Sequence, residues 1–135
     1  MAKLSVEIVT PERRVATLSA DEVVAPAAEG LYGVLPGHSA FLGLLSAGPL
    51  TVRTGGQTEG FFVAGGFFEV AEDRVRVLAD YAEPLASLDV EGAAARLREA
   101  EERRAALGPT DTGLAAADEA VRRERARLYT ARTKG

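Results

Sequence analysis

The pattern of apolar and polar residues changes once along the chain, near Leu88. Before that point, apolar residues come in short alternating runs, such as residues 74–78, separated by residues typical of turns. Runs of this kind predict β-strands. After it, Ala, Arg, Glu and Leu dominate and the apolar residues lie three or four positions apart, which predicts helices. The chain is therefore expected to consist of a β-rich domain at residues 1–87 and a helical arm at residues 88–135.

Short strands are expected in the first domain at residues 3–9, 14–19, 22–25, 32–35, 41–45, 50–54, 59–64, 67–71 and 74–80. The tight connections, with Gly55-Gly56 as a hairpin signal, favour an antiparallel sandwich or a flattened barrel. Gly65-Gly66 lies between two Phe-Phe pairs and is expected to form a tight turn, with a ligand-binding bend as the alternative. Because many strands are apolar on both sides, one sheet face is expected to be covered by the arm, a second sheet or a partner.

Two helices with a short connection are expected in the arm. Asp89 is a plausible N-cap of the first helix, Gly108-Pro109 ends it, and Thr110, Asp111 or Thr112 can cap the second. Their apolar stripes are narrow and rich in alanine: Ala93, Leu97, Ala100 and Leu107, then Leu114, Ala117, Val121, Leu128 and Ala131. At roughly 25 cal/mol per Å² of buried apolar area, such a hairpin is marginal and is expected to change its packing easily.

The charge of the chain is distributed unevenly. Residues 121–135 hold six cations and one anion, Glu124, for a net charge of +5, although the whole chain carries −4. This asymmetry predicts an acidic partner for the end of the arm, or a latch onto the chain's own acidic groups. There is no cysteine, the first residues lack the apolar core of a signal peptide, and no run of apolar residues is long enough to span a membrane. A soluble cytoplasmic protein is therefore expected, and such a protein can still sit on a membrane complex.

The sequence offers few residues for catalysis or cofactor binding. His38 is the single histidine, and beside Ser39 it is more easily explained as a turn residue than as half of a nucleophilic pair. No phosphate-binding glycine loop and no metal-ligand spacing is present. The cluster from Arg122 to Arg125 fits a solvated helix face, an acidic protein surface or nucleic acid. Nucleic acid is the weaker option, because the chain is acidic overall and the cluster has no interleaved aromatic residues.

Three segments carry a resemblance to a known family. Residues 29–38 (EGLYGVLPGH), 64–70 (AGGFFEV) and 77–83 (VLADYAE) resemble segments of the epsilon subunit of bacterial F-type ATP synthases. Their order, their spacing and the helical hairpin that follows also agree, so the resemblance covers essentially the whole chain. It implies an α+β fold, in which a flattened antiparallel β-sandwich of about ten strands at residues 1–87 precedes a two-helix regulatory arm at residues 88–135.

The resemblance also implies a function. A subunit of this kind is a non-catalytic part of the central stalk, docks on the gamma subunit and the membrane ring of c subunits, and couples proton-driven rotation to ATP synthesis. It would lie at the cytoplasmic face of the bacterial inner membrane. Glu29, Gly30, Leu31 and Tyr32 are then expected to face the ring, with His38 nearby.

The arm of this family can extend along the gamma subunit and restrain ATP hydrolysis in the catalytic head of alpha and beta subunits. By this resemblance, the arm's basic residues would approach an acidic segment of the beta subunit. The residues expected to supply that charge are Arg122, Arg123, Arg125 and Arg127.

Some members of the family bind ATP in the compact hairpin through a pattern like [IL]-D-x-x-R-A. This chain has LDVEGA at residues 88–93, so Gly92 stands where the pattern has arginine. The remaining candidate ligands are Glu83, Asp89, Ala93 and Arg122. No cofactor and no metal are therefore expected, and Gly92 disfavours ATP as a regulatory ligand. Two other readings stay open: a free-standing sandwich that binds a ligand under the hairpin, and a nucleic-acid adaptor that uses the arginine-rich helix.

Overall fold

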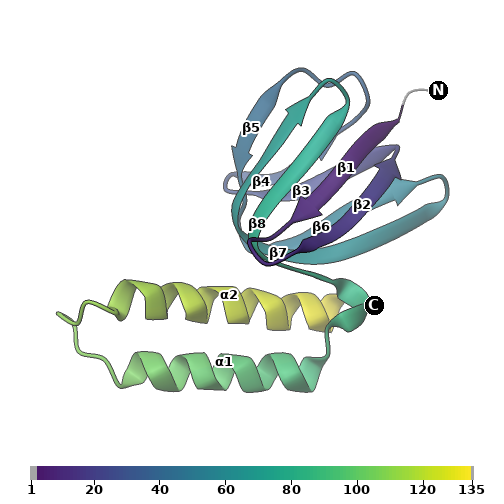
Figure 1. Ribbon diagram of the computed structural model, residues 1–135. Helices are drawn as coiled ribbons and strands as arrows, with labels where there is room; N and C mark the ends of the chain where they lie inside the picture. The colour runs from purple at the N-terminus through teal and green to yellow at the C-terminus, as the bar shows by residue number, and fades with distance from the viewer. Residues whose placement is uncertain (1–2, 135) are drawn as a thin grey trace. The chain divides into compact units, whose positions relative to one another are not determined.

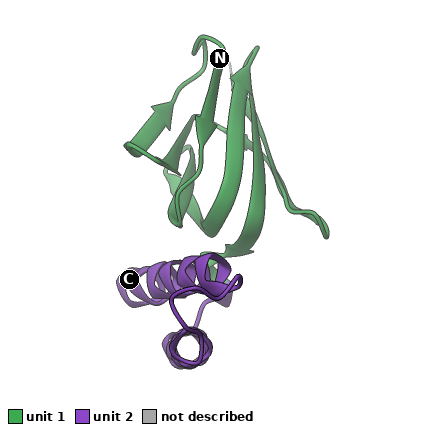
Figure 2. Cartoon of the chain, turned by 90° about the vertical axis from the view of Figure 1, so that its left-hand side faces the viewer, with its two compact units in different colours: residues 1–86 green, residues 87–135 purple. Residues whose placement is uncertain are grey.

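The structure, a computed structural model, describes residues 3–134 and contains eight strands and two α-helices (Figure 1). The strands are β1 (Leu4–Val9), β2 (Arg14–Ala20), β3 (Glu22–Ala27), β4 (Gly30–Val34), β5 (Phe41–Leu44), β6 (Gly48–Thr54), β7 (Gln57–Ala71) and β8 (Arg74–Pro84). A 3-10 turn, η1 (Leu85–Ser87), precedes α1 (Val90–Ala105) and α2 (Leu114–Thr133). The chain divides after Ala86 into two compact units (Figure 2).

The first unit is a sandwich whose two layers share one long strand. The strand order is β2-β1-β8-β7-β6-β3-β4, and β5 also pairs with β7. Residues 57–63 of β7 pair with β6, whereas residues 67–70 pair with β5. All pairs are antiparallel except β1 with β8, which is parallel. A sandwich followed by two helices confirms the expected α+β class, with eight strands in place of the nine read from the pattern or the ten implied by the resemblance.

The count differs because residues 59–64 and 67–71 form one continuous strand. The expectation of a tight turn at Gly65-Gly66 was wrong: both residues lie inside β7, with φ angles of +71° and +87°. A Cβ atom at Gly66 would lie 2.0 Å from the carbonyl oxygen of Leu78, and one at Gly65 would lie 2.3 Å from Asp80 Oδ2. Two glycines therefore let β7 change direction while it stays paired with β8.

The same two glycines reverse which residues of β7 face the core. Before them, Phe61 and Val63 belong to the hydrophobic core; after them, Phe68 and Val70 do. The inward positions thus pass from odd to even numbers, while the register with β8 is kept over residues 61–71. In a strand with regular alternation, the same parity of residues would face the core along its whole length, so it could not place core residues in both layers of the sandwich. The rings of Phe67 and Phe68 lie on opposite faces, because Phe68 is fully buried and Phe67 is exposed.

The second unit is an antiparallel helical hairpin with the expected first cap. The carboxylate of Asp89 accepts the backbone N–H of Gly92 at 3.2 Å, which confirms Asp89 as the N-cap of α1. The expected caps of α2 were wrong, because its N-cap is Gly113. Asp111 instead accepts a hydrogen bond from the backbone N–H of Gly113 at 3.1 Å, which stabilises the turn just before α2. Ala93 and Ala100 are the buried residues of α1.

Candidate functional site

An aromatic cluster forms around Tyr32 of β4. The hydroxyl of Tyr32 lies 3.0 Å from Nε2 of His38, and the tyrosine ring stacks on Phe41 with the ring centroids 4.3 Å apart. Phe41 in turn contacts Phe68, with centroids 5.8 Å apart. The structure therefore brings Tyr32 and His38 together and joins them to the sandwich core.

The hydrogen bonds of His38 argue against nucleophilic chemistry. Its Nδ1 lies 2.7 Å from the carbonyl oxygen of Ser39, which can only accept a hydrogen bond. Nδ1 therefore carries the proton, and in the neutral ring Nε2 accepts from the hydroxyl of Tyr32. Because His38 contacts the carbonyl of Ser39 and not its hydroxyl, the two side chains do not form a nucleophile and base pair. The histidine acts as a link between a loop and β4.

The turn between β3 and β4 presents the other residues expected at this end of the sandwich. Ala27 pairs with Gly30, so Glu29 lies at the tip of a tight turn, and Gly30 has a φ of +126°. Leu31 follows at the start of β4 with 74% of its surface exposed. The tip of this turn therefore presents an accessible apolar side chain, Leu31, beside an accessible carboxylate, Glu29.

A second group of exposed apolar residues was not identified from the sequence. Leu42 and Leu44 of β5 are 65% and 68% exposed, and Leu44 lies opposite Phe67 of β7 in the sheet register. The carbonyl of Leu44 accepts the N–H of Ala28 at 3.0 Å, so this apolar patch reaches the β3–β4 turn. The available signal was the segment Phe41-Leu42-Gly43-Leu44-Leu45, in which four of the five residues are large and apolar.

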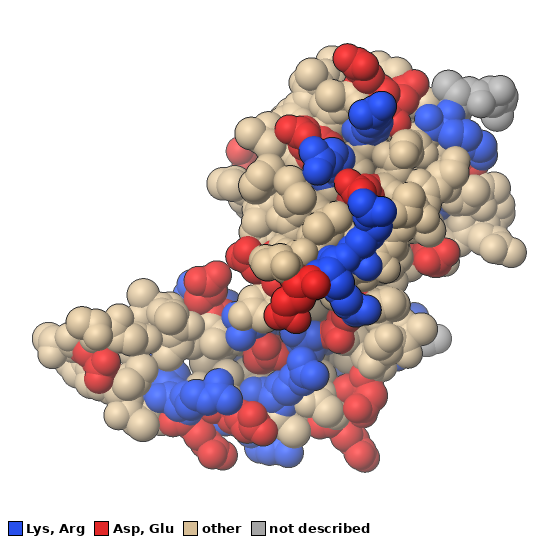
Figure 3. Space-filling view, in the orientation of Figure 1, with Lys and Arg blue, Asp and Glu red and all other residues tan. Residues whose placement is uncertain are grey.

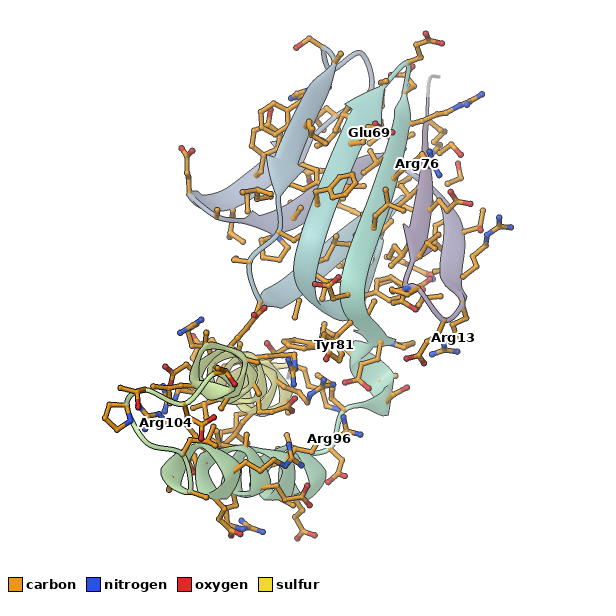
Figure 4. The ribbon with its side chains drawn as sticks, turned by 60° about the vertical axis from the view of Figure 1, so that its left-hand side comes forward. Arg13, Glu69, Arg76, Tyr81, Arg96 and Arg104 are labelled. Carbon is orange, nitrogen blue, oxygen red and sulfur yellow. The ribbon has the colours of Figure 1, made fainter. Side chains whose placement is uncertain are left out.

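A row of charged side chains crosses the strands beside this apolar patch. Arg76 of β8 lies 3.4 Å from Glu7 of β1 and 3.9 Å from Glu69 of β7 (Figure 4), and Arg14 lies 3.1 Å from Glu7. Two cations and two anions alternate along the row. The charges balance locally, so the apolar patch of Leu42, Leu44 and Phe67 is bordered by a row with no net charge.

Polar contacts join the two helices of the hairpin at several levels. Arg104 lies 2.7 Å from Asp118 near the turn, and Arg125 lies 3.9 Å from Glu101. At the open end, Lys134 donates to the carbonyl of Leu88. Basic and acidic side chains alternate along the visible face of the hairpin (Figure 3). A cleft between the helices is lined by Glu101, Arg104, Asp118, Val121, Arg122 and Arg125.

The four arginines expected to act together fall into two pairs. Arg122 and Arg125 are exposed. Nε of Arg123 and Nε of Arg127 instead lie 3.0 Å and 2.9 Å from the two carboxylate oxygens of Glu124. The spacing of Glu124 and Arg127, three positions apart on one helix, already suggests their contact, whereas the contact of Arg125 with Glu101 of α1 could not be read from the sequence.

The residues proposed for ATP do not all come together. Asp89 and Ala93 lie at the start of α1, where the Asp89 carboxylate already caps the helix. Arg122 shares the cleft with Glu101, which is twelve residues further along α1 than Asp89, or roughly 18 Å at 1.5 Å per residue. Glu83 belongs to the first unit. Within residues 3–134, no three His, Cys, Asp or Glu side chains gather where they could hold a metal ion.

Neither helix of the described chain combines the length and apolar character needed to cross a membrane.

The family model for the beta-sandwich domain of the ATP synthase delta/epsilon chain matches residues 3–85.

Two relatives are similar over nearly their full length. The ATP synthase epsilon chain of Myxococcus xanthus (strain DK1622) is 50% identical over 133 residues, which cover 98% of each chain. The ATP synthase epsilon chain of Granulibacter bethesdensis (strain ATCC BAA-1260 / CGDNIH1) is 45% identical and covers 98% of this chain and 99% of its own. A chain in the mitochondrial ATP synthase structure of Euglena gracilis (OSCP, F1 and c-ring) has a TM-score of 0.76 at 23% identity, over 93% of this chain and 79% of that one. At this identity, the similarity to the Euglena chain shows the fold alone.

Proposed function

The chain belongs to the epsilon-chain family of ATP synthases, and we propose that it joins the rotor of a proton-translocating F-type enzyme to the catalytic head. It is a stalk subunit and carries no catalytic site of its own. The observation that carries this proposal is similarity over the whole chain: the matched relatives cover the arm as well as the sandwich, at 45–50% identity. The complex would place it at the cytoplasmic face of the bacterial inner membrane.

The sandwich is proposed to dock through two exposed regions. The β3–β4 turn, with Glu29, Gly30, Leu31 and Tyr32, would contact the ring of c subunits, with His38 supporting it from behind. The apolar patch of Leu42, Leu44 and Phe67 would pack on the gamma subunit. The exposure of Leu31, Leu42 and Leu44 at 65–74% supports both contacts, because surface this apolar is stabilised by removal from water.

The arm is proposed to restrain ATP hydrolysis when its helices separate and extend toward the head. Its packing depends on small residues, Ala93 and Ala100, and on exposed ion pairs that contribute little individually. Such an element opens at low free-energy cost. The basic residues of α2 would then meet acidic residues of the beta subunit. No cofactor is invoked, since Asp89 acts as a helix cap and Gly92 replaces the arginine of the ATP pattern.

Docking is tested by binding of the full chain to the matched gamma subunit and c-ring. Leu44→Asp is expected to weaken binding to gamma by at least tenfold, because it buries a charge in an apolar contact. Leu31→Asp is expected to weaken binding to the ring alone. Leu35→Asp, at another leucine that is 53% exposed, is the matched control. Unchanged binding of both test variants would contradict the proposed surfaces.

Inhibition by the arm is tested by measuring ATP hydrolysis in the matched head of alpha, beta and gamma subunits at low salt. Replacement of Arg122, Arg123, Arg125 and Arg127 by glutamine is expected to relieve inhibition, whereas Arg98→Gln, at an exposed position of α1, leaves it intact. Inhibition should also weaken at high salt, because exposed charges are then screened. If the variant without the four arginines inhibits as strongly as the native chain at low salt, the hypothesis that the arm inhibits through its positive charge is wrong.

A further inference from the structure

Asp73 lies in the tight turn between β7 and β8, and its side chain contacts a loop that is distant in the sequence. The backbone N–H of Gly37 donates to Oδ1 of Asp73 at 2.6 Å, across 36 positions of the chain. We propose that Asp73 is a positioning residue for docking: its carboxylate holds the loop at residues 35–39, and with it Tyr32 and the exposed leucines of β5, in the arrangement that the gamma subunit and the ring bind. This inference rests on the proposed function and names a residue outside both docking regions that sets their affinity.

The backbone of the β7–β8 turn indicates a role for this side chain. Glu72 and Asp73 have φ angles of +51° and +60° and lie between the paired residues Ala71 and Arg74. A two-residue turn with both central φ angles positive favours glycine at its second position. Aspartate there costs more backbone free energy than glycine. This cost is offset where the side chain makes a bond that glycine cannot make, and the contact with Gly37 is such a bond.

The loop at residues 35–39 contains a turn whose central peptide group can take two orientations. The N–H of His38 donates to the carbonyl of Leu35 at 3.1 Å, which closes the turn. Gly37 follows Pro36 and has a φ of +87°, as the third residue of a type II turn does. Types I and II differ in the orientation of the peptide between the two central residues. That peptide supplies the N–H of Gly37, so its charge-assisted bond to Asp73 fixes one orientation.

The loop connects the two docking regions. Nε2 of His38 lies 3.0 Å from the hydroxyl of Tyr32, on the strand that follows the β3–β4 turn. At its other end the loop leads into β5, where the ring of Phe41 stacks on Tyr32 with the centroids 4.3 Å apart. Leu42 and Leu44 follow Phe41 on the same strand and are exposed. A change of turn type in the loop would therefore shift the tyrosine and the exposed leucines together.

The main chain of Asp73 is held by the sheet independently of its side chain. Its carbonyl oxygen accepts the N–H of Ser5 at 2.8 Å. This bond lies at the start of the parallel pairing of β1 with β8, in which Ser5 pairs with Arg74. A substitution of the Asp73 side chain can therefore remove the bond to Gly37 without releasing the turn.

The bond is tested in the full chain alone by hydrogen exchange of the Gly37 amide, measured by NMR. Asp73→Gly accommodates the positive φ and removes the acceptor, so it is expected to speed exchange of this amide about tenfold. Asp73→Asn retains an oxygen acceptor and should restore most of the protection. Glu72→Gly changes the neighbouring turn residue and is the matched control, for which native exchange at Gly37 is expected. Equal exchange in Asp73→Gly and the native chain would overturn the proposal.

The effect on docking is measured as the dissociation constants of the full chain for the matched gamma subunit and for the c-ring. Asp73→Gly is expected to raise both constants roughly threefold to tenfold, because part of the binding free energy must then order the loop. Its urea midpoint should stay near the native value, since the lost hydrogen bond and the relieved backbone offset each other. Asp73→Asn should bind as the native chain does. If Asp73→Asn binds as weakly as Asp73→Gly, the hydrogen bond does not position the loop.

The two experiments separate the failures. If the native chain binds neither gamma nor the ring, the proposed function fails, and the docking role of Asp73 fails with it, whatever the exchange at Gly37. If the native chain binds both and Asp73→Gly binds as tightly despite faster exchange at Gly37, the role of Asp73 alone is overturned. Weaker binding of Asp73→Gly to both partners, with native binding by Glu72→Gly, is the result that the proposal predicts.

Discussion

Gly66 is the residue at which the sandwich is most sensitive to a single added carbon atom. In Gly66→Ala, the new Cβ would lie 2.0 Å from the carbonyl oxygen of Leu78 and 3.0 Å from its carbonyl carbon. Both are backbone atoms, so no side-chain rotation can relieve the contact, and β7 or β8 must move by about 1 Å. The φ of +87° adds a further penalty for any L-residue. Overpacking costs about 1–3 kcal/mol and the left-handed backbone about 1–2 kcal/mol, so we expect a loss of about 2–5 kcal/mol.

Two other glycines provide controls for the separate contributions. Gly55 also has a positive φ, +62°, but a Cβ there would meet no atom within 4 Å. Gly55→Ala should therefore show only the backbone penalty of about 1–2 kcal/mol. Gly33 lacks a positive φ and has open space around it, so Gly33→Ala should change stability by less than about 0.5 kcal/mol.

The assay is urea unfolding followed by NMR signals of backbone amides in β7 and β8, which report on the sandwich and not on the helices. A free energy of unfolding for each variant follows from the linear dependence on urea. The reasoning is refuted if Gly66→Ala costs no more than Gly55→Ala, because the close approach of β7 to Leu78 would then be absent.

Three further predictions concern polar contacts. The hydrogen bond from Lys3, followed by that from the N–H of Gly55, lowers the pKa of Asp21. The ionised Asp21 carboxylate therefore stabilises the fold above its unfolded pKa of about 3.9, and this stabilisation is lost as the pH falls through the lower pKa of the folded state. The difference in urea midpoint between the native chain and Asp21→Asn should accordingly shrink toward pH 2. Tyr32→Phe removes the hydrogen bond to His38 and should lower the free energy of unfolding by about 1 kcal/mol in the same urea assay. An unchanged urea midpoint would show that this hydrogen bond does not stabilise the fold. Asp118→Asn breaks an ion pair that is 38–46% exposed and should destabilise the hairpin by at most about 1 kcal/mol at low salt and by nothing measurable at high salt, as helix melting will show.

The sequence was sufficient for those elements in which local pattern and tertiary structure agree. Period-two runs located the strands, and Asp89 marked the start of α1 because a capping carboxylate acts within three residues of its own position.

The predictions that failed concern features that depend on tertiary contacts or on the local geometry of a turn. Two glycines in succession are typical of turns, and only the approach of β8, with the carbonyl of Leu78, explains why Gly65 and Gly66 continue a strand. The expected cap of α2 failed because Asp111 closes the preceding turn, and the helix begins later, after Gly113. The division of the four arm arginines also depends on structure, since Arg125 finds its counter-ion on α1.

The most direct test of the account is ATP hydrolysis by a matched head of alpha, beta and gamma subunits, measured with the full chain and with a chain that ends at Ser87. The account predicts that both bind the head through gamma and that only the full chain lowers the rate. If the chain ending at Ser87 inhibits as strongly as the full chain, the arm is not the brake. If neither chain binds the head, the proposed place in the stalk is contradicted.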